Sequence, residues 1–342
     1  MSPSALDMGA PPLKVLFLVP RMDKASTRYR VLQYMPSLER GGISCTVKSL
    51  SKTSRNWFSL AGQLRRADLV FIQKKLFTRL ELFMVRKLAR RMVYDFDDAV
   101  MFKCDAASAR QIERQRKRFA ATVRKADLVI AGNSYLRAQT LPWNPNVQVL
   151  PTPLHTGSYP ERQIVGDTGA VVLGWIGSRG TLKYLRDISP VLENLGCLFP
   201  RLKLKIVADD FFSLEHLEVI RKPWSAMDEI ADLHSFDIGL MPLRDDEWTR
   251  GKCGFKLLQC MAVGLPVVCS PVGMNSEIVT HGREGFWAST PEEWREHLSR
   301  LITDAGLRQS MGRLGRQKVE QTYSLAVNAP KLLHYLRELR RA

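Results

Sequence analysis

The most constraining feature of this sequence is a series of short, continuous apolar runs separated by stretches with helical periodicity. The first run, VLFLVP at Val15–Pro20, lacks alternating polar positions, which is typical of a strand buried on both faces. A helical stretch follows from about Arg28 to Arg40, with its apolar side chains on one side, and ends at Gly41 and Gly42. Repetition of this pattern predicts an α/β fold with doubly wound parallel sheets.

The remaining predicted strands form two groups on either side of residues 151–169, which contain three prolines and no periodicity and therefore indicate a linker. The first group adds Ser44–Val47, Leu69–Gln73, Met92–Phe96, Leu128–Ala131 and Val147–Leu150. The second group consists of Val171–Ile176, Leu204–Val207, Ile238–Met241 and Pro266–Ser270. In such sheets, ligands bind at the carboxyl ends of the strands.

The length of 342 residues is enough for two domains. We expect a first domain at residues 1–160, a second at 161–325, and a C-terminal helix at 326–342 that packs back toward the first. An apolar content of 45% and a charged content of 25% indicate globular domains rather than a disordered chain.

The charge is strongly asymmetric along the chain. Residues 1–162 hold 28 lysines and arginines against 12 acidic residues, so +16 of the net charge of +17 lies in the first half. The basic residues form two clusters, one of Arg86, Lys87, Arg90 and Arg91 and one of Arg114, Arg116, Lys117, Arg118, Arg124 and Lys125. Such clusters are either solvated helix faces or surfaces for an anionic membrane or substrate. No nucleic-acid-binding module is recognisable, so nucleic acid is not an expected partner.

Cysteine usage and the N-terminal segment indicate the compartment. The six cysteines are scattered without a Cys-x-x-Cys pair, which favours reduced thiols over disulfides or a zinc site. Residues 1–13 lack the basic start and apolar core of a signal peptide, and no apolar run approaches the roughly 20 residues of a membrane span. We therefore expect a cytoplasmic protein, and the basic first half suggests peripheral attachment to the inner face of a membrane.

The turn after the first strand of the second half reads GWIGSRGTLKYL and has the features of an anion site. Gly177 and Gly180 let backbone N–H groups approach a ligand, Ser178 lies between them and the charged Arg179, and Thr181 is a candidate cap for the next helix. The alternative is that this turn serves chain geometry alone.

A second anion-binding element is predicted from GFKLLQCMAVGLPVVCSPVGMNSEIV, which starts at Gly254. Lys252 and Lys256 are four residues apart, which would place them on one helix face. Gly273 then leads into a helix capped by Asn275 or Ser276. A nucleotide diphosphate needs such cations and helix ends, so we expect Arg179, Lys252 and Lys256 to converge on one. Taken singly, each lysine is equally well explained as a solubilising surface residue.

At this point the sequence resembles a known family. The segment GKCGFKLLQCMAVGLPVVCSPVGMNSEIVTHGREGFWA is similar to the donor-sugar motif of the family 4 glycosyltransferases with the GT-B fold. Further similar pieces are GWIGSRGTLKYL, FDIGLMPL, GNSYL, VLPTPL and RYRVLQYMPSLERGGI. The resemblance implies two facing Rossmann-like domains, the C-terminal one binding the nucleotide sugar and the N-terminal one the acceptor, with a C-terminal helix crossing back.

This chain departs from the two glutamates that the family typically carries in this motif. The first glutamate position falls on Gly251 and the second on Gln259, whose amide can still hydrogen-bond a ribose hydroxyl. The pattern Gly-Lys-x-Gly-Phe-Lys-x-x-Gln resembles a branch that uses lysines instead. The resemblance also places Glu277 near the donor, although an acid in the first turn of a helix is equally expected for the helix dipole. Trp224 is either a contact of the nucleotide base or a core residue.

The first half offers polar residues at its own strand ends. In YDFDDAVM, Asp97 and Asp98 follow a strand and could accept a hydrogen bond from an acceptor hydroxyl or act as a base, unless they only form a turn. Asn133 ends another strand, and Arg28 and Arg30 follow the first, where they could meet an anionic acceptor.

These observations predict a glycosyltransferase that moves a sugar from a nucleotide-diphosphate donor to a hydroxyl acceptor without a metal or other cofactor. Lys256, Asp97 and Asp98 are the candidate catalytic residues. By resemblance the enzyme would retain the anomeric configuration and act on a lipid-linked or cell-surface glycan. The alternatives are an epimerase of the same fold and a non-catalytic module that binds nucleotide sugars.

Overall fold

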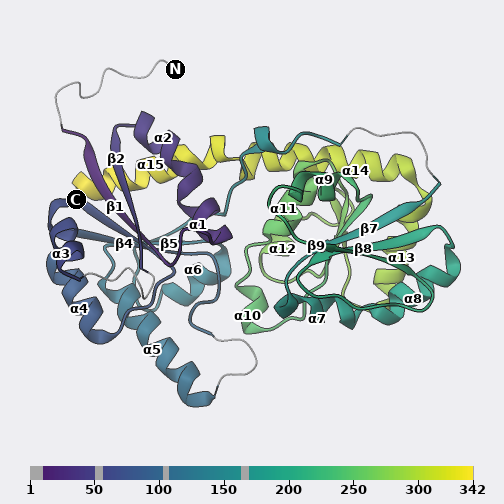
Figure 1. The fold of residues 1–342 in the computed structure, drawn as a ribbon, viewed down its shortest axis with the longest axis horizontal. Helices are drawn as coiled ribbons and strands as arrows, with labels where there is room; N and C mark the ends of the chain where they lie inside the picture. Colours follow the sequence, from purple (N-terminus) through teal and green to yellow (C-terminus); the bar gives the residue numbers. More distant parts are fainter. Residues whose placement is uncertain (1–10, 51–56, 103–107, 163–168, 342) are drawn as a thin grey trace. The chain divides into compact units, whose positions relative to one another are not determined.

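The computed structural model describes residues 11–50, 57–102, 108–162 and 169–341. The chain divides into two compact units (Figure 1). Unit 1 comprises Met1–Pro151 and Asn328–Ala342, and unit 2 comprises Thr152–Val327. The C-terminal segment therefore belongs with the N-terminal half of the chain.

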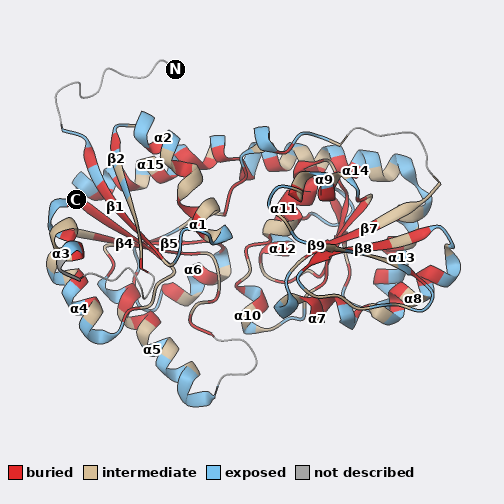
Figure 2. Ribbon diagram, in the orientation of Figure 1, coloured by how far each residue is buried: buried red, intermediate tan, exposed pale blue. Residues whose placement is uncertain are grey.

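Unit 1 is built on a parallel six-stranded sheet with the order β2-β1-β3-β4-β5-β6. The strands are β1 (Leu13–Val19), β2 (Ile43–Ser49), β3 (Leu69–Gln73), β4 (Arg91–Phe96), β5 (Leu128–Ala131) and β6 (Val147–Val149). Every residue of β3 and β5 is buried, as expected for central strands covered on both faces (Figure 2).

Helices flank this sheet. They are α1 (Ala25–Arg30), η1 (Leu32–Tyr34), α2 (Met35–Arg40), α3 (Trp57–Arg66), α4 (Arg79–Leu88), α5 (Ala109–Lys125) and α6 (Ser134–Thr140). Unit 1 also contains most of α15 (Leu325–Arg341). In that helix Arg337 donates a hydrogen bond to the Gly41 carbonyl and Arg340 donates one to the Pro11 carbonyl, which ties the C-terminal segment to β1 and α2.

Unit 2 repeats the architecture with a parallel sheet of order β12-β11-β10-β7-β8-β9. Its strands are β7 (Val171–Ile176), β8 (Leu202–Ala208), β9 (Glu218–Pro223), β10 (Ile238–Met241), β11 (Val267–Cys269) and β12 (Gly285–Trp287). Its helices are η3 (Thr156–Ser158), α7 (Arg179–Asp187), α8 (Ser189–Leu198), α9 (Glu229–His234), α10 (Glu247–Arg250), α11 (Phe255–Ala262), α12 (Met274–Ile278), α13 (Pro291–Thr303), α14 (Ala305–Lys318) and η4 (Val319–Tyr323).

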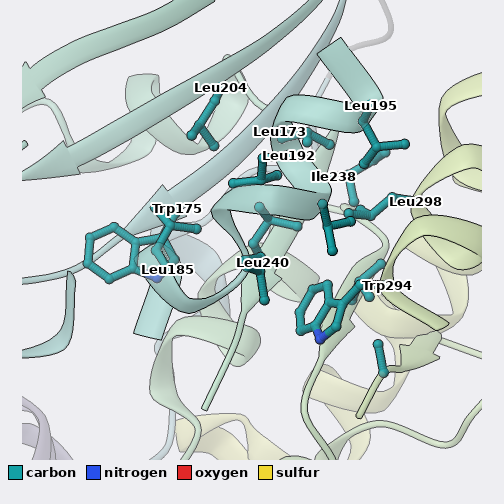
Figure 3. Packing of buried hydrophobic residues seen from close by; sticks show 14 of the residues in the cluster. Leu173, Trp175, Leu185, Leu192, Leu195, Leu204, Ile238, Leu240, Trp294 and Leu298 are labelled. Atoms are coloured by element: carbon teal, nitrogen blue, oxygen red, sulfur yellow. The ribbon is translucent and has the colours of Figure 1, made fainter. Parts of the chain in front are cut away.

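The core of unit 2 lies between the sheet and helices α7, α8 and α13 (Figure 3). Leu173 and Trp175 of β7 pack with Leu185 of α7, Leu192 of α8 and Trp294 of α13. Trp175 is almost fully buried and is the next-to-last residue of β7, and its ring packs against Gly177 in the turn that follows the strand. The Trp175 ring also lies beside the side chain of Lys256.

All ten strands predicted from apolar runs are present, so the predicted α/β class is confirmed. Two further strands, β9 and β12, were missed; both are edge strands, and β9 is polar and so lacks a continuous apolar run. The predicted helix from Arg28 to Arg40 is wrong in detail. It starts earlier and is broken at Val31, whose φ of −129° and ψ of −65° are not helical.

Candidate functional site

The candidate donor site lies at the carboxyl ends of the unit 2 strands. Strand β7 ends at Ile176 and leads through Gly177 and Ser178 into α7, while β11 leads toward α12. Because the strands are parallel, these turns emerge at the same edge of the sheet as the end of β10. The chemistry of this edge depends on which charged groups reach it.

At this edge, the charge of Lys256 receives little compensation from the groups around it. It lies in the first turn of α11, with its Nζ 4.7 Å from the centroid of the Trp175 ring and 3.5 Å from Thr181 Oγ1. It forms no ion pair with any residue in the described part of the chain. Burial and then the neighbouring charge of Lys252 lower the pKa of Lys256 from 10.5 to about 7. An anion binding here would relieve both effects, because it would supply the missing counter-charge.

Lys252 lies near Lys256, as predicted, but not because the two lysines share a helix face. Helix α11 begins only at Phe255, so Lys252 precedes the helix and the prediction of a shared helix face is wrong. The chain turns at Gly254, which adopts a left-handed conformation with φ of 60°. The Lys252 ammonium lies 5.5 Å from the centroid of the Trp248 ring and is still close enough to Lys256 to disfavour a second positive charge.

Arg179 does not complete the predicted trio of cations. Its side chain is 76% exposed, and its Nε lies 3.5 Å from Asp210 Oδ2. The backbone N–H of Arg179 donates to Asp209 Oδ1 at 2.6 Å, so a carboxylate already occupies the N-terminus of α7. The expectation that Arg179 points with the two lysines at one anion is therefore corrected.

The two residues before Arg179 have structural explanations. A Cβ on Gly177 would come within 1.8 Å of the Trp175 ring, and the Gly177 N–H donates to the Val207 carbonyl. Glycine is required there to seat the tryptophan. Ser178 is the N-cap of α7, so the predicted cap at Thr181 is wrong by three residues; Thr181 Oγ1 instead accepts from the Ser178 N–H.

Gln259 is not available to a ribose. Its side chain is buried, and its Nε2 donates to the Tyr159 hydroxyl, which in turn donates to Glu229 Oε1 at 2.9 Å. Gly251 closes the end of α10 with its N–H bonded to the Trp248 carbonyl. The predicted ribose contact at Gln259 is thus replaced by a buried network that sequence spacing could not show.

The turn into α12 is tightly constrained. Gly273 has a φ of 54°, and a Cβ there would come within 2.4 Å of the Arg250 carbonyl oxygen. Asn275 is not the predicted cap: its Nδ2 donates to the Ser270 carbonyl, whereas its buried Oδ1 has no hydrogen-bond partner in the described part of the chain. Glu277 lies exposed on α12, so its predicted donor contact stays a prediction.

Trp224 directly follows β9, at the same edge of the sheet, and its N–H donates to the Ala208 carbonyl. Its side chain is 44% exposed, which excludes the core alternative. Contact with a nucleotide base stays a prediction.

The strand ends of unit 1 carry a charge cluster built around Lys74, which the sequence analysis missed. The Lys74 ammonium lies 2.7 Å from Asp97 Oδ1 and 2.6 Å from Asp98 Oδ2. Burial alone would lower the pKa of Lys74, but the two carboxylates raise it above its ordinary value. Lys74 also has a φ of 57°, which is costly for a side chain other than glycine. Its position directly after β3 was the signal that could have identified it.

The predicted acceptor residues of unit 1 are mostly structural. Arg30 is 2% exposed, forms a buried ion pair with Asp95 and donates to the Leu150 carbonyl, so its predicted contact with an acceptor is corrected. Asn133 is fully buried and caps α6 by accepting from the Leu136 N–H, which corrects its predicted role as well. Arg28 is half-buried against the Tyr29 ring.

Within the described ranges, no three or more His, Cys, Asp or Glu side chains gather in a way that could hold a metal ion. Across the same ranges, no helix combines the length and apolar character that crossing a bilayer requires.

Comparison with known proteins identifies the segment that carries Lys252 and Lys256. Residues 207–304 match the family model described as Glycosyl transferases group 1. Spore coat protein SA of Bacillus subtilis (strain 168) is 27% identical over 78 residues, a match that spans 22% of this chain and only 21% of that protein. A segment of unit 2 is thus similar to the group 1 glycosyl transferases.

Similar solved structures extend over both units. Sucrose-phosphate synthase from Thermosynechococcus elongatus superposes with a TM-score of 0.72 at 12% identity, covering 95% of this chain and 99% of that one. Anabaena Alr3699/HepE in complex with UDP and glucose gives a TM-score of 0.67 at 16% identity, covering 95% and 99%. The fold of this chain is therefore GT-B, as the resemblance implied.

Proposed function

We propose that this chain is a glycosyltransferase that binds a nucleotide-diphosphate sugar at the strand ends of unit 2 and transfers the sugar to a hydroxyl acceptor. The observation that carries the proposal is Lys256, a partly buried cation without a described counter-ion, inside the segment that matches the group 1 glycosyl transferases. Anabaena Alr3699/HepE, with the same fold, has been captured with UDP and glucose. A diphosphate would supply the counter-charge that Lys256 lacks among the described residues.

In this proposal the lysines act mainly on the departing diphosphate. Negative charge grows on the phosphate oxygens as the bond to the sugar breaks, and ammonium groups fixed in a partly dehydrated site stabilise that charge. Lys256 is held by the Trp175 ring and Thr181, so little reorganisation is needed when the charge develops. Lys252 adds a second cation.

Binding would also change the protonation of Lys256. Near pH 7 about half of the free protein would carry a neutral Lys256, and an incoming diphosphate would favour the protonated form. The bound state then contains the full positive charge that catalysis needs.

The acceptor side is proposed to lie at the Lys74 cluster of unit 1. Asp98 is the more exposed of the two carboxylates that Lys74 holds, and it could accept the proton of an acceptor hydroxyl. We further propose retention of the anomeric configuration and a lipid-linked or cell-surface glycan acceptor. We also propose that the chain belongs to a branch of family 4 without the paired glutamates, because lysines stand in its motif. The cysteines, none of which is placed in a disulfide among the described residues, favour a cytoplasmic site of action in this proposal.

The test is a thermal-shift panel of UDP-, GDP-, dTDP- and ADP-sugars on the wild-type protein and on Lys256→Met. A ligand that binds only the folded state raises the melting temperature. We expect one nucleotide class to stabilise the wild type, and the variant to lose about tenfold to a hundredfold in affinity, the usual range for a charge-assisted hydrogen bond.

The variant and its control separate binding from folding. Methionine nearly preserves the side-chain volume while removing a poorly solvated charge, so Lys256→Met should be at least as stable as the wild type. Lys203→Met, at the opposite end of the unit 2 sheet in β8, should bind nucleotide normally. Equal affinity in wild type and Lys256→Met would refute the proposed site.

Turnover then distinguishes the remaining enzymes and binding modules. With the nucleotide sugar that binds, sugar transfer to an added acceptor supports the proposal. Conversion of the donor without any acceptor would instead identify an epimerase, and binding without either reaction would identify a binding module.

A further inference from the structure

A second charged region of the molecule lies away from the strand ends, on two neighbouring helices of unit 1. Helices α4 and α5 contact each other and line a groove of about 1820 Å³, which Phe77 and Trp143 also line. Much of the surface of both helices is exposed (Figure 2). We call this region the α4–α5 surface and define it by the groove residues together with Leu80 and Met84.

Nearly all the charged side chains that line the groove are positive. Ten lysine or arginine side chains line it, against one acidic side chain, Glu113. Some of the ten are neutralised locally: Arg86 pairs with Asp127, and Lys117 pairs with Glu113. Six side chains form no ion pair or hydrogen bond with any residue that the structure describes: Arg79, Lys87, Arg110, Arg114, Arg118 and Lys125. The fold therefore brings basic side chains together here without placing enough carboxylates beside them to neutralise their charge.

Helix α4 adds an apolar face beside this charge. Leu80, Phe83 and Met84 are 72%, 63% and 42% exposed, although all three are large apolar side chains. Their spacing of three and four residues places them on one side of the helix, and Leu82 and Val85 on the other side bury it against the unit. A helix that is already anchored by its inner face does not need this outer apolar face for folding.

Trp143, which also lines the groove, adds a side chain of interfacial character. Trp143 is half-exposed, and the Arg124 guanidinium lies 4.6 Å from the centroid of one of its rings. Tryptophan with a basic neighbour is typical of the boundary between water and lipid, where the ring enters the headgroup layer and the cation meets phosphate.

We propose that the α4–α5 surface docks this protein on an anionic lipid bilayer. Leu80, Phe83 and Met84 enter the headgroup region, and the unpaired cations of α4 and α5 lie against lipid phosphates. Nucleic acid, which is also an anion, could neutralise these basic side chains. Leu80 and Met84, however, offer it neither stacking nor hydrogen bonds, whereas transfer of both side chains from water into lipid is favourable. This inference is independent of the proposed transferase activity.

The experiment is co-sedimentation of the full chain with vesicles of phosphatidylcholine alone or containing about 30% phosphatidylglycerol, at salt low enough to leave a Debye length of about 10 Å. We expect binding only to the anionic vesicles. The charge reversal Arg110→Glu/Arg114→Glu should lower the partition coefficient by more than about twentyfold, because each basic residue near such a surface contributes about a fivefold factor. The apolar variant Leu80→Ser/Phe83→Ser should lower it by more than about tenfold.

Matched controls change equally exposed residues elsewhere. Arg295→Glu/Arg313→Glu reverses two exposed arginines of α13 and α14, and Leu198→Ser/Met227→Ser removes two exposed apolar side chains of unit 2. Both controls should bind vesicles like the wild type. Equal binding to neutral and anionic vesicles, or equal losses in test and control variants, would overturn the proposal. So would tight, salt-sensitive binding of a single-stranded oligonucleotide that the apolar variant leaves unchanged while vesicle binding is absent.

Discussion

Lys74 in unit 1 and Lys256 in unit 2 occupy comparable places, because each emerges near the carboxyl ends of a parallel six-stranded sheet. Their surroundings are opposite. Lys74 meets two carboxylates, which raise its pKa, whereas Lys256 meets an aromatic ring and a second lysine, and its pKa falls to about 7. Carboxylates of the protein itself neutralise Lys74, whereas Lys256 forms no ion pair with a described residue.

The difference between these two surroundings indicates which lysine needs a counter-charge from a ligand. A buried or half-buried charge is tolerated when the structure supplies its partner, and it is costly when the structure does not. Arg30, which is buried in unit 1 but paired with Asp95, belongs to the first class. Lys256 belongs to the second class, which is why it carries the functional proposal.

The largest expected effect breaks the internal pairing of unit 1. Asp95→Ala leaves the Arg30 guanidinium buried without its counter-charge, which should cost about 3–5 kcal/mol in the free energy of unfolding of this unit. Hydrogen exchange of the β4 backbone amides measures it. Asp187→Ala, which removes an exposed pair with Arg244 in unit 2, should cost about 1 kcal/mol or less. Similar costs for the two variants would contradict the comparison.

The next effect concerns the unmatched lysine and pH. Nucleotide-sugar affinity should fall about tenfold between pH 6 and pH 8, because the protonated fraction of Lys256 in the free protein falls through a pKa of about 7. A diphosphate esterified at both ends does not titrate in this range, so calorimetry across it reports the protein. The Lys256→Met variant should show a flat profile, and a flat wild-type profile would rule this mechanism out.

The same lysine should change stability in the opposite direction. Its pKa is lower in the folded state than the ordinary 10.5, so the unfolded chain binds more protons between about pH 7 and pH 10. The contribution of Lys256 to the free energy of unfolding of the ligand-free protein therefore rises with pH across that window. Comparing the wild type with Lys256→Met by urea denaturation at several pH values isolates this contribution.

A smaller effect is expected at the Lys74 cluster. Lys74→Met leaves Asp97 and Asp98 without their shared cation, which should lower kcat about tenfold if one of them receives the acceptor proton. Donor affinity should change by less than about twofold, because Lys74 lies in unit 1. The neighbouring Lys75→Met is the matched control for kinetics. A loss confined to donor affinity would reverse the assignment of the two units.

The smallest effect is expected for Arg179→Ala. Its exposed side chain pairs only loosely with Asp210, so nucleotide affinity measured by calorimetry should change by less than about threefold. A loss as large as that of Lys256→Met would show that the arginine turns toward the ligand on binding, which would restore the original prediction from the sequence.

The sequence by itself determined the α/β class, the ten strands predicted from apolar runs and the edge of each sheet to which the polar strand-end residues belong. Short continuous apolar runs bounded by turn residues indicate strands covered on both faces, and parallel strands place their carboxyl ends at one edge. Asp97 and Asp98 were identified this way, since they lie just beyond such a run, whereas Lys252 and Lys256 were identified from their spacing and from the cations that a diphosphate needs. The polar edge strand β9 escaped because its sequence does not carry this pattern.

Only the tertiary structure decided which of these polar groups are already satisfied. Gln259 is bound to Tyr159, which is 100 residues away in the chain, and Arg30 is bound to Asp95, 65 residues away. Hydrogen bonding and ion pairing depend on distances of a few ångströms between side chains, and sequence spacing sets those distances only within one helix or strand. That is why Lys74 is part of a closed charge cluster, whereas Lys256 forms no ion pair with any described residue.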